Sequence, residues 1–200
     1  GWVFLNQRRP EDAGRQFAQV VRDTAGDAAQ ATLHAAALND FVRAYADFGQ
    51  VGKAWAAFGK LDADRAPTMY AALAALYLDQ GKSDKAIFAL RQLLAAAPGH
   101  ADVCRWQADV ARATLALPGA TLDDKAAEIA RLAALWGALR KTTQLPADAR
   151  TDCRDDAAAM AGELARAWHS EGVKTKDPAV LAAADRLYGA YLAEFDDAAD

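Results

Sequence analysis

The sequence lacks the features that mark membrane spans, nucleic-acid binding and common catalytic centres. It has no run of 18 apolar residues, so no segment is expected to cross a membrane. The formal net charge is −4 with both signs interspersed, which argues against nucleic acid or anionic lipid as a partner. A Gly-rich phosphate loop and a nucleophile elbow are missing, and the three histidines, His34, His100 and His169, share no metal-ligand spacing. We therefore expect no enzymatic activity, no metal site and no cofactor.

The composition favours helices throughout. Only 8% of the residues are aromatic although 53% are hydrophobic, and alanine supplies about a quarter of the chain. Alanine is the best helix former and allows helices to approach closely. The six prolines and thirteen glycines lie mostly between periodic segments, where they would end helices.

One spacing occurs three times in the first half of the chain. An aromatic residue is followed nine residues later by alanine, and four residues after that by a large apolar residue. The three sets are Phe4/Ala13/Phe17, Tyr45/Ala54/Phe58 and Tyr77/Ala86/Leu90. A period near 34 residues is typical of helix–turn–helix units that stack on copies of themselves.

The clearest unit covers residues 67–100. Tyr70, Leu73 and Tyr77 fall on one helical face with the small Ala74 beside them, and Gly81 is placed to close that helix. This unit resembles the tetratricopeptide repeat (TPR), with Ala74 where Gly is usual and Leu90 where Phe is usual. The resemblance implies an all-α fold without strands, a right-handed solenoid of stacked antiparallel helix hairpins.

The sequence predicts a single TPR-like array that is a fragment of a longer chain. The step from Ala13 to Ala54 is 41 residues, seven more than the usual period, which predicts helices near Gly26 that are longer by two turns. Beyond residue 100 the pattern weakens, although Thr121 and Asp124 form a capping-box pattern. The expected parts are a truncated repeat at 1–34, repeats at 35–66 and 67–100, a degenerate extended hairpin at 101–144 and an extended TPR-like hairpin at 145–200.

The TPR resemblance also implies where a partner protein binds. Such arrays use a concave face, made by the side of each first helix that does not point at its second helix. Spacing places eight polar residues on that face, and for most of them an ordinary solvated helix surface is the alternative. They are Asn6, Asn39, Arg43, Asp47, Asp79, Arg105, Asp109 and Arg112. Only Asn39, Arg43 and Arg105 resemble the set with which chaperone-binding members hold a terminal carboxylate, so that ligand is not expected.

The two cysteines leave two possibilities open. Cys104 and Cys153 fall in the first helices of adjacent units, which lie side by side in a TPR array. They are either two small buried thiols or a disulfide, which would imply an oxidising compartment.

Two smaller groups of residues are assigned by position. The acidic pairs at 123–124, 155–156 and 196–197 are expected at helix N-termini or on solvated faces. His34 and His100 are expected at exposed helix starts. Tryptophans are expected in the core, and Trp55 is the exception that could lie on an outer face. The tryptophans are Trp2, Trp55, Trp106, Trp136 and Trp168.

The leading functional hypothesis is a non-catalytic scaffold that binds a partner protein or another copy of itself. The segments 165–175 and 187–195 resemble the long TPR proteins of deltaproteobacterial gliding-motility machinery. That resemblance implies a periplasmic, envelope-associated assembly in a bacterium. The alternatives are a regulatory or substrate-docking module of a larger enzyme and, third, an array that binds a small molecule or glycan.

Overall fold

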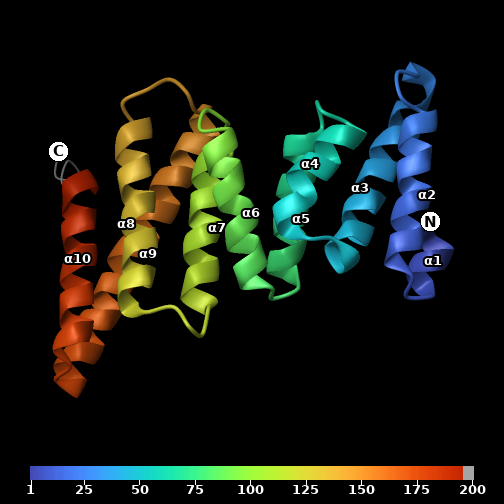
Figure 1. Ribbon diagram of the computed structural model, residues 1–200. Helices are drawn as coiled ribbons and strands as arrows, with labels where there is room; N and C mark the ends of the chain where they lie inside the picture. Colours follow the sequence, from blue (N-terminus) through green and yellow to red (C-terminus); the bar gives the residue numbers. More distant parts are fainter. Residues whose placement is uncertain (196–200) are drawn as a thin grey trace. The chain divides into compact units, whose positions relative to one another are not determined.

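The computed structural model describes residues 1–195 and is all-helical in that range, with no strand (Figure 1). The predicted all-α class of stacked helix hairpins is confirmed. The chain forms two compact units, Gly1–Leu93 (unit 1) and Leu94–Asp200 (unit 2). The acidic pair at 196–197 lies outside the described residues.

Unit 1 is built from helices that pack mainly on their neighbours. Helix α3 packs against α2 and α5, and α4 packs against α5. The elements are α1 (Trp2–Asn6), α2 (Pro10–Asp23), the 3-10 turn η1 (Ala28–Gln30), α3 (Ala31–Phe48), α4 (Val51–Leu61), α5 (Ala66–Asp79) and α6 (Ser83–Ala96), in which the boundary between the units falls.

The repeated alanines are fully buried in unit 1. Ala13, Ala54 and Ala86 are fully buried in α2, α4 and α6, and the large residue four positions later is buried in each case. Gly81 adopts the left-handed conformation, with φ +68°, where the chain turns from α5 into α6. The repeated spacing therefore marks the inward face of the second helices.

The seven additional residues between the first two repeats are not two extra helical turns, so that prediction is wrong. Helix α2 has 14 residues, the same length as α5 and α6, while α3 has 18. The rest of the insertion is the connection at 24–30, in which Gly26 has φ +76°.

Histidine 34 is not at an exposed helix start, and the expectation for it is corrected. Its Nδ1 lies 2.9 Å from Thr24 Oγ1, and its Nε2 lies 3.0 Å from Asp62 Oδ2. The bond with His34 lowers the pKa of Asp62, although partial burial acts in the opposite direction. His34 thus ties the end of α2 to the end of α4, a long-range contact that spacing cannot reveal.

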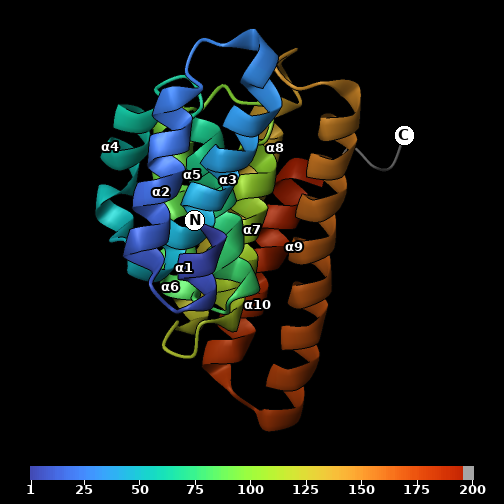
Figure 2. The ribbon, with the colours of Figure 1, turned by 90° about the vertical axis from the view of Figure 1, so that its right-hand side faces the viewer.

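Unit 2 consists of two longer hairpins, in which α7 packs on α8 and α9 packs on α10 (Figure 2). Thr121 and Asp124 form the predicted capping box, and Asp177 Oδ1 accepts the backbone N–H of Ala179 at 2.8 Å. The helices are α7 (Val103–Ala116), α8 (Leu122–Leu139), α9 (Ala147–Thr175) and α10 (Pro178–Phe195). Their long fully buried side chains come from α7, α8 and α10: Val110, Ile129, Leu132 and Leu187.

The tryptophans only partly follow the prediction. Trp106, Trp136 and Trp168 are buried in unit 2. Trp2 is 51% exposed, which corrects its assignment to the core. Trp55 is 36% exposed and packs edge-on against Tyr70, with ring centroids 5.3 Å apart.

Candidate partner-binding grooves

Unit 1 carries a groove of about 300 Å³, called here the unit 1 groove. Helices α1, α3 and α5 contribute to it, and its lining mixes apolar and polar side chains. The lining residues are Trp2, Leu5, Asn6, Arg43, Asp47, Leu76 and Gln80.

Trp2 contributes apolar surface to the unit 1 groove, and two contacts fix its orientation. The indole Nε1 donates a hydrogen bond to Asp40 Oδ2 at 2.9 Å. The indole ring packs edge-on against the ring of Phe17, with the ring centroids 6.3 Å apart. Trp2 is still half exposed, so it offers apolar surface in a fixed orientation.

The polar side of the unit 1 groove carries two charges one helical turn apart. Arg43 and Asp47 are exposed on α3, and within residues 1–195 neither forms an ion pair or a hydrogen bond. Burial raises the pKa of Tyr77, and the nearby Tyr45 and Asp47 raise it further. Because neither side chain is paired within residues 1–195, Arg43 and Asp47 can pair with charged groups of a partner protein.

Unit 2 carries a larger groove of about 540 Å³ between α7 and α9, called here the unit 2 groove. The α7 side includes Asp102, Arg105, Asp109 and Arg112, and the α9 side is formed by four aspartates. The complete lining is Ala101, Asp102, Cys104, Arg105, Asp109, Arg112, Asp148, Ala149, Asp152, Cys153, Asp155 and Asp156.

The charges of the unit 2 groove are only partly compensated. Arg105 pairs with Asp102 at 2.9 Å, while Arg112 bridges Asp109 at 2.9 Å and Asp156 at 2.8 Å. Six aspartates and two arginines line the groove, so its lining is net negative. Asp148 and Asp152 have no ion-pair partner in the described part of the chain.

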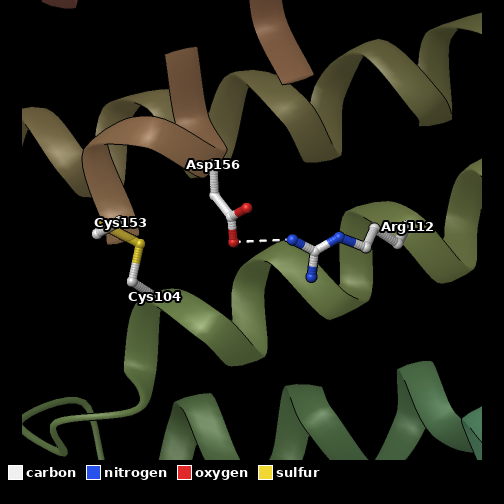
Figure 3. Close-up of a disulfide and its surroundings, with 4 residues drawn as sticks. All are labelled: Cys104, Arg112, Cys153 and Asp156. Atoms are coloured by element: carbon white, nitrogen blue, oxygen red, sulfur yellow. Dashed lines mark hydrogen bonds and ion pairs between the residues drawn. A yellow bond between two sulfur atoms is a disulfide. The ribbon is translucent and has the colours of Figure 1, made fainter. Parts of the chain in front are cut away.

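A disulfide joins the two walls of the unit 2 groove. Cys104 of α7 and Cys153 of α9 are bonded, with their Cα atoms 5.6 Å apart, and both line the groove. Figure 3 shows this bridge beside the ion pair of Arg112 with Asp156. The walls are therefore linked by one covalent bond and by an ion pair two turns farther along α7.

The surroundings of the unit 2 groove shift the pKa values of two of its charged side chains, Asp109 and Arg112. Burial raises the pKa of Asp109 above its usual range, and the nearby Asp156 adds to the increase, although Arg112 opposes it. For Arg112, burial lowers the pKa, but the bonds to Asp156 and Asp109 outweigh it and the net shift is upward. The upward shift of Asp109 is thus caused by its removal from water, and that of Arg112 by its two acidic partners.

The raised pKa of Asp109 predicts a pH dependence of stability. A carboxyl that binds its proton more tightly in the folded state adds stability that is fully present below its unfolded pKa of about 4. That contribution is lost as the pH rises through the folded value. The unfolding free energy of wild-type unit 2, relative to that of Asp109→Asn, should therefore fall as the pH rises above about 4.

Denaturant titration at a series of pH values measures this difference. Asp185→Asn, an exposed site on α10, is the matched control and should give a curve parallel to the wild type. Parallel curves for Asp109→Asn as well would contradict the pKa assignment.

The structure brings six of the eight predicted partner-facing residues into these grooves. Asn6, Arg43 and Asp47 line the unit 1 groove, and Arg105, Asp109 and Arg112 line the unit 2 groove. Asn39 and Asp79 are exposed but line neither groove.

Other lining residues were missed by the sequence analysis. Trp2 was assigned to the core by spacing, and no local signal would have placed it in a groove. The acidic wall of α9 does have a signal, because aspartates at 148, 152, 155 and 156 share one helical face.

Between Gly1 and Phe195, no group of three or more His, Cys, Asp or Glu side chains is arranged to hold a metal ion. No helix in the same range is both long and apolar enough to cross a membrane.

The chain resembles two solved structures of TPR-like repeats. Both are crystal structures of nearly identical TPR-like repeats from a Podosopora anserina protein described as a kinesin light chain, one of them a single-substitution variant. Sequence identity is 20% and 19%, the TM-score is 0.40 in both cases, and 95% of this chain and 90% of each of those chains are covered. No protein-family model and no curated protein matches the sequence.

Proposed function

We propose that this protein is a non-catalytic scaffold that binds a partner protein through the unit 1 and unit 2 grooves. One observation carries the proposal: six of the eight partner-facing positions expected from repeat spacing line one of the two grooves. Helical repeat arrays of this kind generally use such surfaces for protein interaction.

The chemistry of the two grooves suits protein segments of different character. The unit 1 groove combines the rigid apolar surface of Trp2 with free charges on Arg43 and Asp47, a mixture that fits an amphipathic segment. The unit 2 groove is net negative, so it favours a segment that carries lysine or arginine. Two grooves of different charge allow one chain to hold two parts of an assembly.

We extend the proposal to a multiprotein assembly of the bacterial envelope, in the periplasm. The disulfide between Cys104 and Cys153 supports this compartment, because such bonds persist where the environment is oxidising. The resemblance of segments 165–175 and 187–195 to deltaproteobacterial envelope proteins supports the gliding-motility role.

The test is quantitative capture of proteins from native envelope extract by the immobilised chain. Two double variants remove groove charges, Arg43→Ala/Asp47→Ala in the unit 1 groove and Asp148→Asn/Asp152→Asn in the unit 2 groove. Lys53→Ala, at an exposed position of α4 outside both grooves, is the control. For a partner that contacts these side chains, we expect a loss of about 1–2 kcal/mol per central charged residue, or roughly tenfold in affinity.

The result is read as depletion relative to the control variant. A protein recovered equally by wild type and Lys53→Ala, but lost from one groove variant, supports the proposal and assigns the groove. If the captured protein is another copy of this chain, sedimentation velocity of each variant shows which groove joins the copies. Equal recovery of every captured protein by both groove variants would overturn the groove assignment.

A further inference from the structure

We propose that the Cys104–Cys153 disulfide is a redox-sensitive clasp, which holds the first turns of α9 on α7 and so sets the width of the unit 2 groove. In this proposal, reduction of the bond releases residues 147–158 of α9 while the rest of unit 2 stays folded. The inference rests on the proposed function only where it concerns partner binding, because the clasp itself can be measured without a partner.

The first turns of α9 bury very little apolar surface. Of residues 147–158, only Cys153 and Ala157 are buried, and Ala149 is partly buried against the same core cluster. These side chains are small, and hydrophobic stabilisation scales with the apolar area removed from water. Without the disulfide, little apolar contact holds this part of α9 in place.

The later turns of α9 are anchored differently. Ala161, Ala165 and Trp168 belong to a core cluster that also contains Ile129 and Leu187 from α8 and α10. This end of the helix packs against two other helices through large side chains. Release is therefore expected to be local and confined to the end of α9 that borders the groove.

The polar contacts between α7 and α9 are too weak to hold the first turns of α9 without the disulfide. The ion pair between Arg112 and Asp156 also joins α7 to α9, but both side chains are well exposed, and exposed pairs are screened by water and salt. On α9, Asp148, Asp152 and Asp156 follow one another at four-residue intervals, and like charges at this spacing destabilise a helix. The surface charge of this segment thus weakens the helix that the disulfide retains.

The redox step is an ordinary thiol–disulfide exchange. A dithiol reductant approaches from the groove, which both cysteines line, and one of its thiolates attacks a sulfur of the bridge. The S–S bond between Cys104 and Cys153 breaks, and its two sulfur atoms end as thiols. The reductant supplies the two electrons and the two protons and is itself oxidised to a disulfide.

Hydrogen exchange read by mass spectrometry on the whole chain tests the clasp. Dithiothreitol is the dithiol, and oxidised and reduced protein are compared under native conditions. We expect reduction to accelerate exchange in residues 147–158 by several-fold more than exchange in α8, α10 and residues 161–172. The double variant Cys104→Ala/Cys153→Ala should show the fast pattern with or without dithiothreitol.

Two outcomes would overturn the proposal. Acceleration of the same size throughout unit 2 would mean that the disulfide acts only on the unit as a whole and is no local clasp. Unchanged exchange in residues 147–158 would mean that packing alone holds α9. Neither outcome bears on the capture experiment above, so the clasp and the scaffold role stand or fall separately.

Discussion

Replacement of both Cys104 and Cys153 by alanine is expected to lower the free energy of unfolding of unit 2 by about 4 kcal/mol. The bridge closes a loop with a sequence separation of 49 residues. In the chain-entropy account, a cross-link of this length removes conformations mainly from the unfolded state, and the removed entropy corresponds to that free energy. An effect of this size is a large part of the total stability of a small domain.

Hydrogen exchange in increasing denaturant measures this loss, because it reads each unit separately in the intact chain. Unit 1 provides the internal reference and should keep its midpoint. Wild-type protein in dithiothreitol should approach the stability of the double variant, and the double variant should not respond to the reductant. A midpoint of unit 2 that is the same in oxidised and reduced wild type would refute the prediction.

The second large effect is expected from Phe58→Ala, which should lower the free energy of unfolding of unit 1 by roughly 3–5 kcal/mol. Phe58 is fully buried, and its ring meets those of Phe41, Tyr45 and Tyr70 at centroid distances of 6.0, 5.1 and 6.2 Å. Truncation leaves a cavity among three rings that come from α3 and α5 and cannot all move inward. Burial in this cluster raises the pKa of Tyr70 to about 12, as expected where water is largely excluded.

Phe88→Ala is the matched control in the same unit. Phe88 is 42% exposed on α6, so removal of its ring leaves no enclosed cavity and should change stability by well under half as much. Chemical denaturation with the exchange readout for unit 1 compares the two variants. Equal losses for Phe58→Ala and Phe88→Ala would show that the aromatic cluster is not the centre of the unit.

Local sequence signals predicted the features that depend on neighbours along the chain. The helix ends at Gly81 and Thr121 were readable because caps and left-handed turns involve residues only a few positions apart. The buried alanines were readable because they recur with helical spacing. These rules place a residue on a face of its own helix and say nothing about what lies opposite.

The features missed by the sequence analysis all depend on residues far apart in the chain. His34 was expected to be exposed but meets Asp62, 28 residues away. Trp2 was expected in the core but is held half exposed by Asp40, 38 residues away. The additional residues near Gly26 could have extended either helix or the connection, and each solution satisfies the same local propensities.

The sequence by itself therefore determined the helical class and the repeat spacing, and it selected six polar residues that line the two grooves. Periodicity and alanine content are sufficient for these, because helix formation and hairpin stacking follow local rules. Only the tertiary structure decided that Cys104 and Cys153 are bonded and that the polar face gathers into two grooves of different charge. Both depend on which side chains of separate helices come within a few ångströms of one another, a distance set by packing rather than by spacing along the chain.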